Sequence, residues 1–239
     1  MMRIVKLCSI LAVAVSFLGA REACAQERFG SAGSFAVSAE RLMGFVYART
    51  SSEVLGVTTT RSNTTLTFLN SASFDSAMSG PTTNYSSARI AFDFFPINGL
   101  SLGGSIGLYH VSSSVEQEAN GLSQEEDLGS GLGFIFTPRI GYAVMFTPKV
   151  GLWPRGGVSY ASVHAESPGG SELTASGVAI TLESPFVIAP VPHVAFLVGP
   201  SLDLGVGGST ETQGAGGTTV SRDRTGTDIG VHGGMTAFF

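Results

Sequence analysis

Residues 131–146, with the sequence GLGFIFTPRIGYAVMF, alternate between two kinds of side chain. Every even-numbered position is apolar, whereas the odd-numbered positions are mostly small or polar and include Arg139. Because successive side chains of a β-strand point to opposite faces, this period of two predicts a strand with one apolar and one polar face. Any fold of this chain must cover the apolar face with either protein or lipid.

The same alternation recurs along the chain. Eight segments show it, at about 34–49, 88–96, 99–112, 131–146, 150–163, 176–188, 195–206 and 228–239. The best contender for a membrane-spanning helix, residues 185–200, contains four prolines, and each proline costs about 3 kcal/mol inside a helix. The sequence therefore predicts an all-β protein.

The connections between the predicted strands alternate in length. Residues 96–99, 147–149 and 189–193 are tight turns rich in Pro, Gly and Asn. The other connections are long and polar, at about 50–86, 113–129, 164–175 and 208–226. Short periplasmic turns and long outer loops are typical of bacterial outer-membrane barrels. We therefore predict that residues 26–239 form one domain, an eight-stranded antiparallel up-and-down transmembrane β-barrel in which these four long loops are extracellular.

A soluble β-sandwich would show the same alternation, because each of its sheets also buries one face. The charged residues favour the barrel. An arginine that faces lipid costs about 2–4 kcal/mol at the bilayer midplane, and the charges within the predicted strands lie opposite the apolar side chains. Lys149 is the only lysine after residue 25, and 13% of the chain is charged. A soluble surface typically holds about 25–35% charged residues.

The inward-facing charges predict a network that fills the lumen, because the interior of an eight-stranded barrel is just wide enough for side chains. Counting outward from the loop near residue 169 pairs Arg155 with Glu183, and the turn at 147–149 places Arg139 diagonal to Arg155. Glycines such as Gly141 and Gly157 leave room for these groups. The predicted lumen charge network comprises Arg89, Asp93, Arg139, Arg155, Glu183, Asp203, Asp228 and His232.

Aromatic residues gather toward both ends of the predicted strands, as two interfacial girdles would require. The predicted periplasmic girdle consists of Phe35, Phe94, Phe95, Phe146, Trp153, Phe186, Phe196 and Phe239. The predicted outer girdle consists of Tyr47, Tyr85, Tyr109, Phe134 and Tyr160.

The first 25 residues predict a secretory signal peptide. Arg3 and Lys6 form a basic start, residues 7–20 an apolar run, and residues 23–25 an A-x-A cleavage site. Both cysteines, Cys8 and Cys24, lie in this segment, so we expect no disulfide in the processed protein. The whole chain has a net charge of −5, and an acidic surface makes nucleic acid an improbable partner.

The chain resembles the small bacterial outer-membrane barrels of the OmpA-membrane-domain and OmpX type. The resemblance lies in the A-x-A signal, the eight alternating strands and the last strand, which ends GVHGGMTAFF. Segments 35–45, 87–95, 98–109 and 151–160 are also similar to a family of uncharacterised predicted outer-membrane proteins. The resemblance implies localisation in the bacterial outer membrane after signal cleavage. It also implies that Phe239 belongs to an assembly signal.

Three features fit the barrel poorly. Pro138, Pro154 and Pro200 fall inside predicted strands, so bulges or gaps in the hydrogen-bond ladder are needed there. The adjacent residues Glu40 and Arg41 would point to opposite faces unless a bulge intervenes. Residues 53–70 predict a hairpin, which could extend above the membrane or add two wall strands. A ten-stranded barrel is therefore the second choice.

The sequence favours a non-enzymatic protein with a structural or surface-interaction role through its polar loops. The alternative is a small passive channel. A remote alternative is a lipid A-modifying enzyme, because His110 and Ser112 resemble the His-x-Ser pair of lipid A deacylase barrels. The asparagine and glycine that usually follow there are Ser113 and Ser114 here.

No histidine has metal-ligand spacing, so we expect no metal and no cofactor. The expected partners are outer-membrane lipid, lipopolysaccharide and the outer-membrane assembly machinery, which would bind the C-terminal strand.

Overall fold

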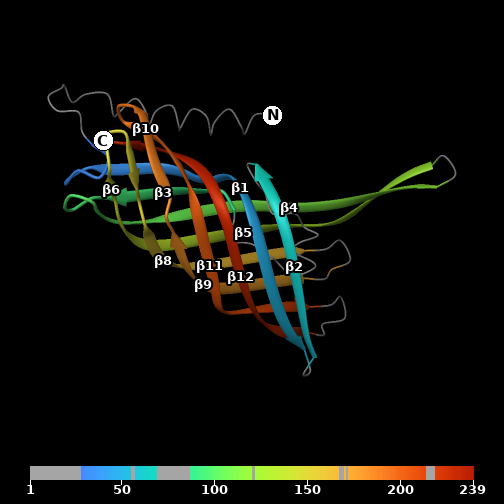
Figure 1. Ribbon diagram of the computed structural model, residues 1–239. Coiled ribbons are helices and arrows are strands. Elements are labelled where there is room, and N and C mark those ends of the chain that lie inside the picture. The colour runs from blue at the N-terminus through green and yellow to red at the C-terminus, as the bar shows by residue number, and fades with distance from the viewer. Residues whose placement is uncertain are drawn as a thin grey trace.

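The computed structural model describes residues 28–54, 57–68, 87–119, 122–166, 170, 172–213 and 219–239, and the regular structure in these ranges is β-strand (Figure 1). The predicted signal peptide lies outside the described residues. Within them, no helix is long and apolar enough to cross a membrane. The strands are β1 (Phe35–Val54), β2 (Val57–Phe68), β3 (Arg89–Phe94), β4 (Leu100–Ala119), β5 (Leu122–Tyr142), β6 (Val144–Met145), β7 (Val150–Leu152), β8 (Arg155–Glu166), β9 (Glu172–Glu183), β10 (Phe186–Val191), β11 (Val194–Gln213) and β12 (Thr219–Phe238).

Eight of these strands form a closed antiparallel circuit. The order is β12-β1-β3-β4-β5-β8-β9-β11, and β11 pairs again with β12. The short strands β6, β7 and β10 are the parts of the wall next to the tight turns, and we call this side of the barrel the turn end. They are separated from β5, β8 and β9 by interruptions at 143, 153–154 and 184–185. The prediction of an eight-stranded antiparallel barrel is confirmed.

Strand β2 lies outside this circuit. It pairs with the distal part of β1, from Met43↔Phe68 to Val54↔Val57. The prediction that residues 53–70 form a hairpin of their own is therefore wrong, because residues 57–68 are a single strand whose partner is β1. The proximal part of β1 pairs instead with β3, from Phe35↔Phe94 to Glu40↔Arg89. Because β2 is an addition to a circuit that is already closed, the ten-stranded alternative is not the arrangement found.

The strands continue well into the ranges predicted as long loops. Pairing between β4 and β5 reaches Ala119↔Leu122, so most of 113–129 is a hairpin of two paired strands, which projects far beyond the others (Figure 1). Likewise β1 and β2 enter 50–86, β8 and β9 enter 164–175, and β11 and β12 enter 208–226. These extensions could not be predicted from the sequence, because the alternation of apolar and polar residues stops there. The Ser and Thr residues nevertheless allow the backbone ladder to continue.

The outer face of the wall is apolar, as the alternation predicts. In the stretch 131–146, Phe136, Ile140 and Tyr142 are 50%, 54% and 52% exposed, whereas Ile135 and Thr137 are buried. The neighbouring strands continue this face with exposed side chains that include Ile90, Phe92, Ile106, Val158, Ile180, Phe196, Val198 and Ile229. A continuous band of this kind is what a bilayer covers.

The three prolines lie next to breaks in strand pairing. The register between β5 and β8 passes from Phe136↔Tyr160 to Arg139↔Gly157, without a pair at Pro138. Pro154 lies in the interruption before β8. Pro200 pairs with Val231 on β12, while on the other side its carbonyl accepts a hydrogen bond from the Ser184 N–H (3.0 Å). Pro138 and Pro200 are thus each at a break in pairing on one side of their strand, whereas Pro154 lies between two strands.

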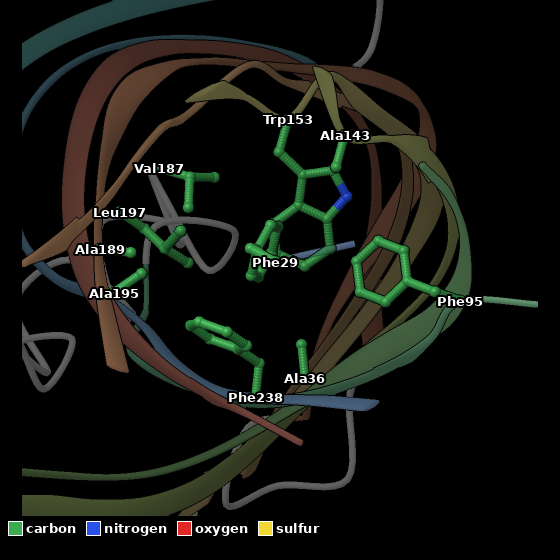
Figure 2. Packing of buried hydrophobic residues seen from close by; sticks show 10 residues of the cluster. All are labelled: Phe29, Ala36, Phe95, Ala143, Trp153, Val187, Ala189, Ala195, Leu197 and Phe238. Carbon is green, nitrogen blue, oxygen red and sulfur yellow. The ribbon is translucent and has the colours of Figure 1, made fainter. Parts of the chain in front are cut away.

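A cluster of aromatic and small aliphatic side chains fills the turn end of the barrel. Phe29 lies near the middle of the ring of strands, surrounded by Phe95, Trp153 and Phe238 (Figure 2). We call these four residues the aromatic cluster. Ala36, Ala143, Val187, Ala189, Ala195 and Leu197 surround it.

The aromatic cluster corrects the predicted girdles. Phe95 and Trp153 are 0% exposed and Tyr109 is 6% exposed, so all three point into the barrel. The alternation of side chains along a strand explains these inward directions, because adjacent residues point to opposite faces. Phe95 directly follows the outward-facing Phe94, and Tyr109 follows the outward-facing Leu108. Phe35, Phe146, Phe186, Phe196, Tyr47, Phe134 and Tyr160 do lie on the outer face. Tyr85 lies outside the described residues.

Candidate functional site

Charged side chains cross the lumen next to the aromatic cluster, on the side away from the turn end. The described residues Glu40, Arg41, Arg89, Asp93, Arg139, Arg155, Glu183 and Asp203 form this group, which we call the ionic layer. Glu40 and Arg41 both enter it because β1 contains a bulge. The register between β1 and β12 shifts between Ala39 and Met43, and Arg41 has a φ of 53°. The two neighbours are thereby buried together, at 3% and 2% exposure.

Arg139 binds two carboxylates from different strands. Its Nη1 lies 2.6 Å from Glu40 Oε2, and its Nε lies 3.1 Å from Asp93 Oδ1. A second bond from Nη2 to Asp93 Oδ2 makes the contact with Asp93 bidentate. This planar two-point geometry is the strongest arrangement that arginine forms with carboxylates. Arg139 thus joins β5 to β1 and β3 across the interior.

Arg41 and Arg155 bind the remaining carboxylates. Arg41 Nη2 lies 2.6 Å from Glu183 Oε1, and its Nη1 lies 2.8 Å from Asp203 Oδ2. Arg155 Nη2 lies 2.8 Å from Glu183 Oε2, and its Nη1 lies 2.6 Å from Glu40 Oε1. Both glutamates therefore bridge two or more arginines, so the pairs form one connected network rather than separate contacts.

A row of hydroxyl groups extends this network along the wall. Arg89 Nη1 donates to Thr137 Oγ1 (3.1 Å), which lies 2.8 Å from Ser159 Oγ. Ser159 in turn lies 2.6 Å from Thr181 Oγ1, and Thr181 donates to Asp203 Oδ1 (2.6 Å). Counting Arg89, four guanidinium groups face four carboxylates. The ionic layer is therefore electrically balanced as well as hydrogen-bonded.

Glycines leave the space that the arginines occupy. A methyl group at Gly141 would lie 2.7 Å from Ser101 Oγ and 2.8 Å from Arg155 Cγ. A methyl group at Gly157 would lie 2.9 Å from Arg139 Cβ. These distances are shorter than van der Waals contact allows, so a side chain at either position would press on the aliphatic part of an arginine, and at Gly157 on the Pro138 carbonyl as well.

The eight residues predicted for the lumen network all lie on the inner face, but they do not form one group. Six of them, Arg89, Asp93, Arg139, Arg155, Glu183 and Asp203, belong to the ionic layer, and the Arg155↔Glu183 pair has the predicted register. Asp228 and His232 are buried beside it, at 4% and 8% exposure. Asp228 pairs in register with Asp203.

The lumen retains little open space at the height of the ionic layer. A cavity of about 20 Å³ borders Glu40, Arg41, Arg155, Glu183 and His232. This volume accommodates about one water molecule. A second cavity of about 50 Å³ lies further from the turn end, lined by Thr50, Ala161, Gly177, Thr210 and Asp228 among others.

Sequence reasoning did not include Glu40, Arg41, Thr137, Ser159 and Thr181 in the network. Thr137, Ser159 and Thr181 could have been predicted from the sequence. Each lies an even number of residues from a predicted lumen charge on its own strand, so it points to the same face. For Glu40 and Arg41 the available signal was the conflict between two adjacent charges, which a bulge resolves. Alternation indicates that such a bulge is needed but does not locate it.

The residues of the enzyme alternative do not meet in a described site. His110 lies on the exposed face of β4 together with Leu108 and Ile106. The side chains of Ser112, Ser113 and Ser114 lie outside the described part of the chain. Within the described part, no group of three or more His, Cys, Asp or Glu residues has a geometry that could hold a metal ion.

The closed circuit of eight strands, the apolar exterior and the side-chain-filled lumen define a small β-barrel of the outer-membrane type. No protein-family model matches the chain, and no curated protein matches it by sequence.

Several solved structures are similar to this chain over most of its length. The outer membrane protein OprG from Pseudomonas aeruginosa has a TM-score of 0.50 at 14% identity, with 90% of this chain and 99% of OprG covered. AlkL, solved in lipid bilayers, has a TM-score of 0.48 at 11% identity, with 92% and 96% covered. Neisserial surface protein A has a TM-score of 0.46 at 13% identity, with 86% and 98% covered. At these identities the likeness to OprG is one of fold alone.

Proposed function

We propose that this protein is a non-conducting β-barrel of the bacterial outer membrane, with a structural or surface-interaction role. In this proposal the ionic layer closes the lumen. The polar strands and loops opposite the turn end reach the cell exterior, where they contact lipopolysaccharide and other surface molecules. The rival function is a small passive channel.

The ionic layer is the observation that carries this proposal. Its guanidinium and carboxylate groups extend from β1 and β3 across to β9 and β11, and most contacts are between 2.6 and 3.1 Å. A permeating ion would have to displace these groups from one another in an interior of low dielectric constant, where charged hydrogen bonds are strongest. A filled and balanced layer therefore favours a closed barrel over an aqueous pore.

Conductance in planar lipid bilayers tests this proposal. We expect the unmutated protein to give no discrete openings. Removing the side chains of one ion pair together, in the double variant Arg155→Ala and Glu183→Ala, should produce openings, because the layer then loses two large groups. The matched control is Arg222→Ala, since Arg222 is an exposed arginine on β12. Reproducible openings in the unmutated protein that disappear in Arg155→Gln or Glu183→Gln would establish the channel instead.

Localisation and assembly are tested separately. We expect the processed chain to fractionate with the outer membrane and, in SDS gels, to migrate differently before and after boiling, as closed barrels do. Deleting Phe239 should reduce the amount that reaches the membrane, because we propose that the C-terminal strand is bound by the assembly machinery. Recovery of the unmutated protein in the water-soluble fraction would contradict the proposed location.

The proposal also states that the protein is not an enzyme. Ser113 and Ser114 stand where the lipid A deacylase pattern has asparagine and glycine, which supports this. Incubation of the purified barrel with lipid A should release no fatty acid. Acyl release that is lost in Ser112→Ala would favour the lipid A-modifying alternative.

A further inference from the structure

The central residue of the aromatic cluster does not come from the wall. Phe29 belongs to residues 28–34, which precede β1 and lie across the turn end of the barrel. Its ring centroid lies 5.4 Å from that of Phe95, 5.0 Å from Trp153 and 5.4 Å from Phe238, in edge-to-face geometry with each. Phe29 is 2% exposed, and Figure 2 shows it in the middle of the lumen. One side chain therefore fills the space that the wall residues leave open.

Residues 28–34 are held in place by the turn between β3 and β4. The Gly99 N–H donates to the Gly30 carbonyl (2.8 Å), and the Gly33 N–H donates to the Phe95 carbonyl (2.7 Å). The Ala32 N–H donates to Asn98 Oδ1 (2.8 Å). Gly30 has a φ of +83°, and a methyl group there would lie 3.1 Å from Ala143 Cβ. The segment thus has a defined conformation that only glycine at position 30 allows without strain.

The wall does not depend on this segment for its strand pairing. The register between β1 and β12 begins at Ala36↔Phe238, and that between β1 and β3 begins at Phe35↔Phe94. In every one of these pairs the β1 residue is at position 35 or later, outside residues 28–34. Withdrawal of residues 28–34 would therefore break contacts at the turn end while leaving every strand pair of the circuit in place.

The ionic layer lies immediately behind the aromatic cluster. The Trp153 ring, which contacts Phe29, has the Arg155 guanidinium 4.4 Å from its centroid. The Trp153 Nε1–H donates to Ser101 Oγ (3.0 Å), and Ser101 is 0% exposed. A water molecule that entered from the turn end would have to pass Phe29 before it reached either group.

We propose that residues 28–34 are a plug that seals the turn end of the lumen against water and small solutes, with Phe29 as the sealing side chain. The plug can leave the barrel without opening the wall. This inference goes beyond the proposed function, which rests on the ionic layer. The two closures are independent, so withdrawal of the plug hydrates the space around Ser101 and Trp153 but does not by itself create a conducting path.

A thiol at position 101 reports whether the plug is in place. Cys8 and Cys24 are the only cysteines of the chain, so Ser101→Cys introduces a single thiol within the barrel. A cationic methanethiosulfonate reagent is added to the folded protein in detergent, and the labelling rate is measured by mass spectrometry. A chain without Ser101→Cys gives the background. In the Ser101→Cys background we expect Phe29→Ala to raise the rate by at least about tenfold, because the space left by the ring admits the reagent.

Three further variants make this result specific. Phe146→Ala removes an aromatic ring from the outer face at the same end, where Phe146 is 62% exposed, and should leave the rate unchanged. Phe29→Leu should give an intermediate rate, because leucine fills part of the space. Asn98→Ala removes only the side-chain bond to Ala32 and should also raise the rate, by less than Phe29→Ala. Asn98→Ala therefore still tests the plug if Phe29→Ala does not fold. Folding of each variant is judged by the gel migration of the unboiled protein.

The outcomes separate the plug from the proposed function. Faster labelling of Phe29→Ala in a barrel that still gives no openings supports both. Equal labelling rates in the parent, Phe29→Ala and Asn98→Ala, with all three folded, would overturn the plug and leave the proposed function standing. Openings in the unmutated protein would overturn the proposed function, whereas the labelling rates would still decide the plug.

Discussion

The ionic layer and the aromatic cluster lie next to each other in the same lumen, but they fill it by different physical means. The ionic layer consists of side chains from the wall strands, fixed by charge-assisted hydrogen bonds with little freedom in distance or angle. The aromatic cluster includes a residue from outside the wall, and its rings contact one another at centroid distances of 5.0 to 5.7 Å. A buried charge is tolerated only when its partners are complete, whereas an apolar contact depends mainly on volume.

Trp153 belongs to both regions. One side of its environment is Phe29 and Phe95, and the other is the pair of guanidinium groups of Arg155 and Arg139, at 4.4 and 5.7 Å from its centroid. An indole ring suits this boundary because it offers an apolar surface, an electron-rich face for a cation and one N–H donor. The comparison predicts that damage to the ionic layer destabilises the barrel most, and that changes at this boundary have smaller effects.

The largest effect is expected for Arg139→Ala. Removing this guanidinium leaves Glu40 and Asp93 with buried carboxylates that have lost a partner, which should lower the free energy of unfolding by about 3–5 kcal/mol. Urea unfolding of the barrel in detergent micelles, followed by tryptophan fluorescence, measures the change. Arg222→Ala is the matched control, because Arg222 is exposed on β12. Equal unfolding midpoints for the two variants would contradict the role given to the ionic layer.

A smaller effect is expected for Gly141→Ala. The added methyl group would meet Ser101 Oγ, Arg155 Cγ and Trp153 Nε1 at 2.7, 2.8 and 2.9 Å, so it would press on both regions at once. Overpacking of this kind should cost about 1–3 kcal/mol in the same unfolding measurement. Gly207→Ala is the control, since a methyl group at Gly207 has no atom within 4 Å. A midpoint for Gly141→Ala that matches this control would mean that the ionic layer can rearrange freely.

The smallest effect is expected for Trp153→Phe. Phenylalanine keeps most of the apolar contact with Phe29 but loses the N–H donor to Ser101 and weakens the interaction with Arg155. The expected loss is about 1–2 kcal/mol. Heat-induced unfolding read from gel migration suits this variant, because it removes the only tryptophan. Tyr160→Phe, on the outer face, should leave the transition unchanged. A loss of stability larger than that of Arg139→Ala would mean that the boundary at Trp153, and not the ionic layer, contributes more to the stability of the barrel.

Much of the barrel was predictable from alternation. The positions of the eight wall strands, the outward direction of Phe136 and Ile140 and the inward direction of Arg139 all follow from a period of two. The register of Arg155 with Glu183 followed from counting across one loop. These features are local, because adjacent side chains of a strand must point in opposite directions and hydrocarbon does not tolerate a charge.

Other features required the three-dimensional structure. The extension of β4 and β5 to Ala119 and Leu122 leaves no alternation of apolar and polar residues in the sequence. The bulge that turns Glu40 and Arg41 inward depends on pairing with β12, more than 190 residues later in the chain. Nothing in the alternation predicts that Phe29 enters the lumen, because it precedes the first strand.

The sequence by itself thus determined which side of each strand faces hydrocarbon and which side carries charge. Only the tertiary structure decided which charges meet and which side chain closes the turn end. The physical reason is that the face to which a side chain points is fixed by its position along its own strand. Partnership depends instead on the closure of the barrel, which brings Glu40, Asp93, Arg139 and Glu183 from four separate strands to within a few ångströms of one another.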